Sequence, residues 1–77
     1  MTVHDRMEIN PKIMPGKPIV RGTRVTVELI VRKLAEGVDE KALLAAYPNL
    51  SAKDIRAALI YAADTVAHEE ILLSPAG

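Results

Sequence analysis

The stretch GKPIVRGTRVTV, from Gly16 to Val27, joins a turn-rich segment before it to a helical segment after it. Its start, Pro15-Gly16-Lys17, is a turn signal, because proline presets the first turn position and glycine accepts a positive φ. Short apolar pairs flank this turn at Ile13-Met14 and Ile19-Val20. Residues 9–25 are therefore predicted to form a small β-hairpin, or arm.

An isolated hairpin of this size is barely stable in water, so it must pack on the rest of the chain or pair with another chain. Pro11 and Pro18 lack an amide donor, which confines their strands to sheet edges or strand starts. We expect the hairpin to mediate dimerisation, with Ile19 and Val20 in a partner or dimer interface.

Three N-cap signals follow the hairpin, at Thr26, Asp39 and Ser51. Each cap is preceded by an apolar residue and followed by another four positions later, the spacing of a hydrophobic staple. The pairs are Val25 with Ile30, Val38 with Leu43, and Leu50 with Ile55. Ser51 with Asp54 also resembles a capping box. Three such signals predict three helices.

The predicted helices run over residues 27–36, over 40–47, and from 52 to 67 or beyond. Gly37 suits the left-handed position that ends the first helix, and Pro48 ends the second. The expected core positions are Val27, Ile30, Val31, Leu34, Leu43, Ala46, Tyr47, Ile55, Ala58, Leu59, Ala62 and Val66.

A second apolar stripe on the third helix lies on a different side, and a helix that is apolar on two sides is deeply buried or in a subunit contact. We expect its residues to meet a partner: Ile60, Ala63 and Ile71, together with Ala67. The whole organisation is one domain, with a flexible N-terminus (1–8), the β-arm (9–25), a three-helix bundle (26–67), and a helix end and tail (68–77).

Size and composition favour a small assembly. A domain of 77 residues buries only about 60% of its unfolded surface, and without cysteine it has no disulfides to compensate. Oligomerisation is the remaining common source of burial, so we expect a homodimer. The sequence shows no signal peptide and no apolar run long enough to span a membrane, so we expect a soluble, cytoplasmic protein.

The net charge is zero, but its distribution is uneven. From Lys12 to Lys33 six basic residues accompany one acidic residue, giving 6 − 1 = +5, whereas from Leu34 to Gly77 the sum is 3 − 7 = −4. A basic front permits an anionic partner on one side of the molecule. Chance clustering in a short chain explains the same pattern.

The segment Ile9 to Ala63 resembles the bacterial domain-of-unknown-function family 433, chiefly through GKPIVRGTR (Gly16 to Arg24) and YPNLSAKDIRAAL (Tyr47 to Leu59). The resemblance implies a mainly α fold: a β-arm followed by a homeodomain-like helix-turn-helix of three helices. Members are similar to antitoxins of bacterial toxin–antitoxin pairs, often encoded beside a PIN-like ribonuclease toxin. No function is carried over to the segment beyond Ala63.

Nothing in the sequence favours an enzyme, a cofactor, a metal site or a small-molecule substrate. Both histidines, His4 and His68, lie in or near the termini, and no metal-ligand spacing is present. Ser51 is better explained as a helix cap than as a nucleophile. The Pro-Gly-Lys turn lacks the glycine spacing of a phosphate-binding loop.

DNA binding would use the N-terminal turns of the third helix, which enter the major groove in a helix-turn-helix. Lys53 and Arg56 are the basic residues there, and Ala57 and Ile60 are expected to face outward with them. Lys53 and Arg56 suit phosphates or guanine edges. The alternative is an ordinary solvated helix face.

The arm offers a second basic set, Lys17, Arg21 and Arg24. In one interpretation these residues grip DNA, because the arginine fork fits phosphate. In the other, Gly22 permits a bend, Arg24 pairs with an acid such as Glu28, and the arm supports the helices or a second protomer.

The primary hypothesis is therefore a small dimeric helix-turn-helix antitoxin that binds operator DNA and, through its C-terminal apolar stripe, a PIN-like toxin. The alternative is a protein-interaction or dimerisation module that has no role in DNA binding.

Overall fold

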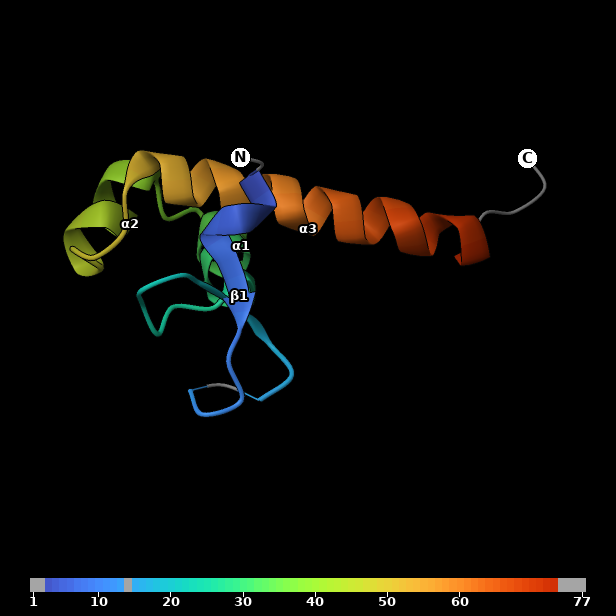
Figure 1. Ribbon diagram of the computed structural model, residues 1–77. Helices are drawn as coiled ribbons and strands as arrows, with labels where there is room; N and C mark the ends of the chain where they lie inside the picture. The colour runs from blue at the N-terminus through green and yellow to red at the C-terminus, as the bar shows by residue number, and fades with distance from the viewer. Residues whose placement is uncertain (1–2, 14, 74–77) are drawn as a thin grey trace.

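A computed structural model of the chain describes the backbone of residues 3–13 and 15–73 and the side chains of residues 5–13 and 15–67. Its elements are the 3-10 helix η1 (Val3–Arg6), the strands β1 (Met7–Ile9) and β2 (Pro18–Val20), and the helices α1 (Val27–Ala35), α2 (Glu40–Ala46) and α3 (Ala52–Leu73). The fold is mainly α with a short N-terminal hairpin, which confirms the predicted fold class (Figure 1). The predicted tail residues 74–77 and the Ile71 side chain lie outside the described parts.

The hairpin forms, but its first strand lies earlier than predicted. β1 pairs antiparallel with β2, with Met7 opposite Val20 and Ile9 opposite Pro18. Residues 10–13 form a turn instead of a strand, because Asn10 accepts hydrogen bonds from the amides of Lys12 and Ile13. Residues 3–8, which we expected to be a flexible terminus, are η1 and most of β1.

The loop after β2 is held by the side chain of Thr23. Its hydroxyl donates to the Val20 carbonyl (2.8 Å) and accepts from the Val25 amide (3.0 Å), in a buried position. Gly22 takes a φ of +83°, which favours glycine. This closed loop brings the chain from the hairpin to the first residue of α1.

All three predicted N-caps form. Thr26 accepts from the Leu29 amide and Asp39 from the Ala42 amide. At the start of α3 the capping box is complete: the Asp54 amide donates to the Ser51 hydroxyl (3.2 Å), and the Ser51 amide donates to the Asp54 carboxylate (3.0 Å).

The first helix ends in a Schellman motif, as the glycine after it suggested. The Gly37 amide donates to the Leu34 carbonyl, and the Val38 amide donates to the Lys33 carbonyl, both at 3.1 Å. Gly37 has a φ of +97°, the left-handed conformation that this motif requires. The motif turns the chain directly into α2.

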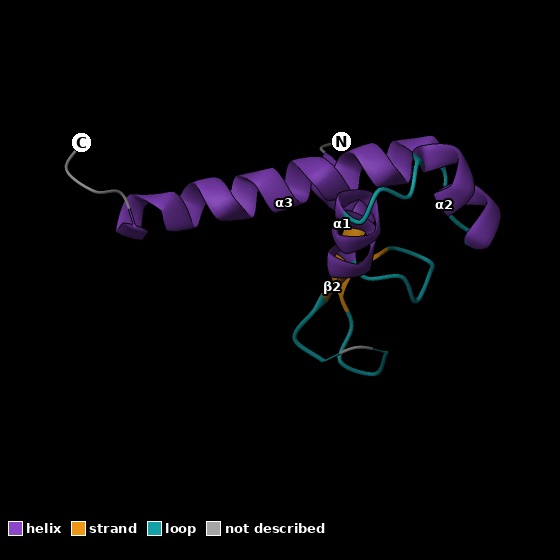
Figure 2. Ribbon diagram, turned by 180° about the vertical axis from the view of Figure 1, so that it is seen from behind, coloured by secondary structure: helices purple, strands orange, loops and turns teal. Residues whose placement is uncertain are grey.

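The core lies where α1, α2, the hairpin and the first half of α3 meet (Figures 1 and 2). It is aliphatic and includes five of the six staple residues; the sixth, Val38, packs against it. Its buried members are Met7, Ile19, Val20, Val25, Val27, Ile30, Leu43, Leu50, Ile55, Ala57 and Ala58. Burial of these side chains is the main stabilising term of the fold.

The buried face of α3 is rotated from the predicted one. Leu59 and Val66, expected in the core, are exposed, whereas Ala57, expected to face outward, is buried. The Arg6 guanidinium donates to Asp54 at 3.0 Å, so η1 lies over the face that Asp54 shares with Ala57. The unexpected N-terminal helix therefore covers part of the buried face of α3, which also packs against α1.

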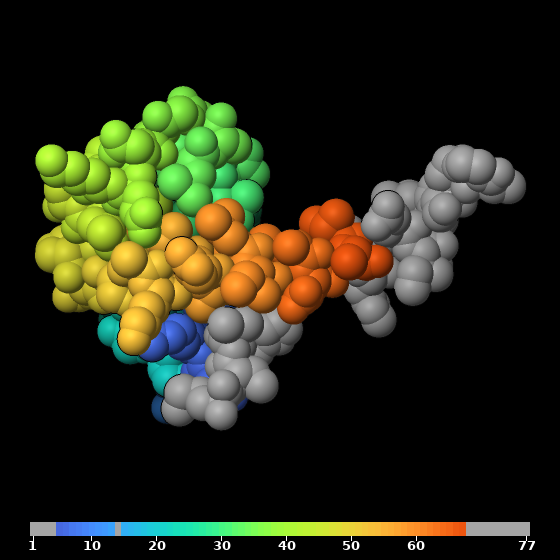
Figure 3. Space-filling model, turned by 90° about the horizontal axis from the view of Figure 1, so that it is seen from above, coloured from blue at the N-terminus to red at the C-terminus, as the bar shows by residue number. Residues whose placement is uncertain are grey.

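The molecule is elongated, with principal extents of 44 × 30 × 24 Å. α3 crosses over α1 and the hairpin, and its C-terminal half projects beyond them (Figures 1 and 3). Within the described residues, no helix combines the length and the apolar character needed to cross a membrane.

Candidate nucleic-acid interface

A tight connection from α2 fixes the position of the start of α3. Five residues, 47–51, join the two helices, and the Leu50 amide donates to the Tyr47 carbonyl (2.9 Å) inside this turn. Leu50 is buried, so the connection is attached to the core. The capping box then sets the direction in which α3 leaves the turn.

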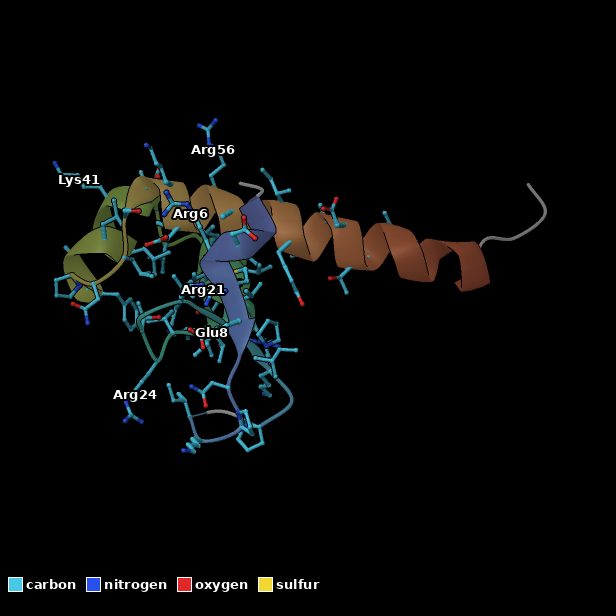
Figure 4. The ribbon with its side chains drawn as sticks, in the orientation of Figure 1. Arg6, Glu8, Arg21, Arg24, Lys41 and Arg56 are labelled. Atoms are coloured by element: carbon cyan, nitrogen blue, oxygen red, sulfur yellow. The ribbon has the colours of Figure 1, made fainter. Side chains whose placement is uncertain are left out.

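Two of the predicted site residues lie on the outer face of this helix start. Lys53 and Arg56 are exposed, whereas Asp54 and Ile55 are buried on the inner face. Arg56 points away from the body of the molecule (Figure 4). The two cations are therefore available to an anionic partner that approaches the first two turns of α3.

Ile60 and Ala57 were also expected on this outer face, but only Ile60 is exposed there. Ile60 is exposed, at 37% of its full area. Ala57 is buried at 1%, so its methyl group cannot contact a base. The candidate face is narrower than predicted and depends on Lys53 and Arg56.

The arm residues Arg21 and Lys17 are largely engaged within the chain. The Arg21 guanidinium donates to the carbonyls of Asp5 (2.7 Å) and Met7 (3.4 Å), which attaches the N-terminal segment to the hairpin. The Lys17 ammonium donates to Glu28 at 3.0 Å. These contacts match the structural interpretation of the arm and leave fewer donors for phosphate.

Glu28 pairs with Lys17 and with Arg32 (2.9 Å), and not with Arg24 as we suggested. The hydrogen bond from Lys17, followed by the one from Arg32, holds the pKa of Glu28 below its ordinary value of 4.5. Arg24 is exposed at the tip of its loop, far from Arg56 (Figure 4). The basic residues therefore do not gather into one patch.

Lys41 is a basic residue that the sequence reasoning left out of the site. It is exposed in the first turn of α2 and extends from the same upper side of the molecule as Arg56 (Figure 4). The available signal was its position two residues after the Asp39 cap, the position that Lys53 holds after the Ser51 cap.

The predicted partner residues are divided between the core and the surface. Ile19 and Val20 are 0% and 1% exposed within the single chain, which corrects their assignment to an interface: their side chains have no area left for a partner. Ile60 and Ala63 are exposed, as an interface requires. The side chains of Ile19 and Val20 instead pack the hairpin on the chain's own helices.

A groove of about 700 Å³ lies between α1 and the second half of α3. Its walls are mostly apolar, and the Lys17–Glu28–Arg32 group lies at its edge. The apolar lining residues are Pro18, Val27, Val31, Ala35, Ala62 and Val66. Among the described residues, no group of three or more His, Cys, Asp or Glu is placed to hold a metal ion.

Comparison with known proteins identifies the family. The model of a family described as "Protein of unknown function (DUF433)" matches residues 7–62. The chain belongs to the DUF433 family. The matched range begins at β1 and ends in the middle of α3, so the DUF433 domain includes both β1, which we had placed later, and the α2–α3 connection.

Two relatives of this DUF433 chain were found. The crystal structure of a DUF433 member protein from Anabaena variabilis ATCC 29413, at 2.00 Å resolution, is similar with a TM-score of 0.76 and 29% identity, over 95% of this chain and 72% of that chain. An uncharacterised protein, y4eO, of Sinorhizobium fredii (strain NBRC 101917 / NGR234) is 45% identical over 53 residues, 69% of this chain. The DUF433 chain spans about a quarter (24%) of that protein's length.

Proposed function

We propose that this DUF433 protein is a helix-turn-helix DNA-binding protein in which α2 and the first turns of α3 form the motif. The observation that carries the proposal is the exposure of Lys53 and Arg56 on the outer face of α3, directly after the tight connection from α2. In a helix-turn-helix the N-terminal residues of the second helix reach the major groove. Arg56 would donate to guanine or phosphate, and Lys53 to phosphate.

The finer part of the proposal is the antitoxin role, and its support is the resemblance of Gly16–Arg24 and Tyr47–Leu59 to antitoxin-like members of the family. On this view the protein represses its own operator in the cytoplasm, and a PIN-like ribonuclease toxin is its protein partner. The exposed apolar side chains of α3 are compatible with such a partner.

The test is DNA affinity measured by fluorescence anisotropy on the DNA upstream of the protein's own gene. Lys53→Ala/Arg56→Ala should weaken binding at low salt at least about tenfold, since each lost phosphate or base contact costs about 1 kcal/mol or more. If both residues contact phosphate, the slope of log affinity against log salt should fall by about 2.

The matched control is Lys12→Ala/Lys33→Ala, which removes the same charge outside the candidate face. Equal weakening by both double variants would show that only net charge matters. Absence of any binding at low salt, with and without the protein encoded by the neighbouring gene, would refute the DNA role.

A second candidate function, a protein-interaction module without DNA binding, is favoured by the apolar groove and by the zero net charge. It predicts a stable protein complex that survives high salt, because apolar burial is not screened. Purification of the DUF433 protein alone, as a monomer that has no partner, would count against this function.

A further inference from the structure

The lysine and arginine side chains of the three α-helices fall into two groups. On α1, Arg32 pairs with Glu28 at 2.9 Å, and Lys33 pairs with Glu36 at 3.7 Å. The other basic residues of these helices, histidine apart, are Lys41 of α2 and Lys53 and Arg56 of α3. Among the residues whose side chains the structure describes, these three have no ion-pair or side-chain hydrogen-bond partner. The fold therefore balances the cations of α1 and leaves those of α2 and α3 without a counter-charge.

The sequence neighbours of these three cations explain why they have no partner. In a helix a side chain meets the residues three and four positions away, and adjacent side chains do not face each other. Lys41 has no acidic residue three or four positions away, and Glu40 is adjacent to it. Lys53 and Arg56 lie three positions apart, so each has another cation as a helical neighbour. Like charges in this relation destabilise a helix, and an anionic partner would relieve the repulsion.

Lys41 and Lys53 also occupy an unfavourable position in their helices. Each is the second residue after a cap, in the first turn, where the helix dipole favours acidic side chains over basic ones. On α1 the charges follow the dipole, because Glu28 lies in the first turn and the basic residues lie in the last. The two lysines reverse this order, and no partner within the described part of the chain offsets it. Their ammonium groups, and not the helix ends, point to an anionic partner.

The side chains of both helices are presented to the same side of the molecule. Asp39 fixes the start of α2 by accepting from the Ala42 amide at 2.8 Å, and the capping box fixes the start of α3. Lys41 and Arg56 extend from the upper side of the molecule, whereas Arg24 extends from the lower side (Figure 4). A partner that approaches the upper side therefore meets cations of α2 and α3 together.

We propose that Lys41 is a phosphate contact that positions α3 in the major groove, and that Arg56 is the residue that recognises a base. This inference rests on the proposed DNA-binding function and deepens it. In a helix-turn-helix the first helix crosses the DNA backbone, while the N-terminal residues of the second contact base edges. α2 and α3 take these two places in the proposed motif, so Lys41 meets the backbone.

Arg56 is the residue of this face that suits base recognition. Its guanidinium is a planar fork that matches the O6 and N7 acceptors of guanine, whereas the ammonium of Lys53 is a point charge that suits phosphate. Ala57 is buried and offers no methyl group to thymine. A phosphate is present in every DNA sequence and a given guanine is not. Lys41 and Arg56 therefore differ in how their contributions depend on the sequence.

The test compares two DNA duplexes by fluorescence anisotropy, one from the DNA upstream of the protein's own gene and one with its bases shuffled. Lys41→Ala should weaken binding to both duplexes by the same factor, about tenfold at about 50 mM salt, and lower the salt slope by about 1. Arg56→Ala should weaken binding to the upstream duplex at least about fivefold more than binding to the shuffled one, because a base contact is lost.

The chain offers matched controls for both residues. Lys12→Ala removes the same charge at another exposed lysine, outside α2 and α3, and should leave both affinities within about twofold of the native values. Lys41→Arg keeps the charge and should preserve binding to both duplexes. Arg56→Lys also keeps the charge but removes the fork, so it should lose preference for the upstream duplex while keeping most of the salt slope. Helix content by circular dichroism confirms that each variant is folded.

Three results would overturn this inference. They are native binding of both duplexes by Lys41→Ala, a loss in Lys41→Ala that is confined to the upstream duplex, and full preference for the upstream duplex in Arg56→Ala. Absence of DNA binding by the native chain would refute the proposed function together with this inference. Any of the three results in a chain that binds DNA would refute the inference alone.

Discussion

At the scale of single residues, the segment Arg21-Gly22-Thr23-Arg24 contains four different roles in four consecutive positions. Arg21 attaches the N-terminal segment through main-chain carbonyls, Gly22 supplies a positive φ, and Thr23 closes the loop with its hydroxyl. Arg24 extends into solvent at the tip of the loop (Figure 4). Three of the four residues therefore act in folding, whereas the Arg24 side chain extends away from the fold.

Asp54 takes part in both the capping box and the ion pair with Arg6, and the first prediction concerns it. Asp54→Ala removes the acceptor of the Ser51 amide and leaves Arg6 unpaired, so it should lower the free energy of unfolding by about 1–3 kcal/mol in urea denaturation. Arg6→Ala should cost less than about 1 kcal/mol, because Arg6 is partly exposed. An equal loss in both variants would show that the ion pair, and not the capping box, dominates.

A second prediction concerns pH. Because Lys17 and Arg32 hold the folded-state pKa of Glu28 below 4.5, the folded chain binds fewer protons than the unfolded chain in that range. The contribution of Glu28 is therefore present above pH 4.5 and lost as the pH falls through the folded-state pKa. Glu28→Gln should lower the melting temperature at neutral pH, with a difference that disappears in acid. A difference independent of pH would contradict this assignment.

At the scale of elements, local signals begin all three α-helices of this protein and end the first two. Side-chain caps begin α1, α2 and α3, and a Schellman motif ends α1. These motifs satisfy amides and carbonyls that a helix end leaves unpaired. The short helices α1 and α2 consequently begin and end at defined residues, which directs the chain through two sharp changes of direction before α3.

The prediction at this scale concerns Gly37, where an added methyl group would meet no neighbour within 4 Å. Gly37→Ala should therefore cost only the left-handed backbone conformation, about 1–2 kcal/mol in the free energy of unfolding. Gly37→Asn should cost less, since asparagine tolerates this conformation. Equal costs in urea denaturation would point to a side-chain clash as the cause.

At the scale of the whole molecule, the chain has one packed end and one projecting helix. The core occupies the end where α1, α2 and the hairpin meet the first half of α3 (Figure 2). The proposed DNA-binding face lies on the first turns of α3, and the exposed apolar side chains Leu59, Ile60 and Val66 follow it along the same helix.

The corresponding prediction is a melting temperature that depends on protein concentration. If folding and association are coupled, each tenfold increase in concentration stabilises the dimer by about 1.4 kcal/mol, which corresponds to roughly 4 °C for two chains of this size. Ile60→Glu, at an exposed residue of the predicted interface, should weaken the dependence, as measured by differential scanning calorimetry. A constant melting temperature for the native chain would show that unfolding is not linked to association.

The helices could be predicted from the sequence because their signals are local. A cap residue and its staple partners lie within six residues of one another, and a terminal glycine acts on the last turn of its own helix, so Thr26, Asp39, Ser51 and Gly37 were assigned correctly. The Ser51 cap also set the register of the third helix, from which Lys53 and Arg56 were predicted to lie on its outer face. Their exposure is a consequence of where the capping box starts α3.

The position of β1, the buried face of α3 and the use of the arm cations were decided by the tertiary structure. Arg6 meets Asp54 across 48 positions of sequence, and Arg21 reaches carbonyls 14 and 16 positions away. Such contacts have no local signature, because many pairings of charge and apolar surface are compatible with one sequence pattern. By itself the sequence determined where the three α-helices begin, where the first two end, and that the fold is mainly α. Only packing decided which residues the core covers, since burial depends on the simultaneous arrangement of all the elements.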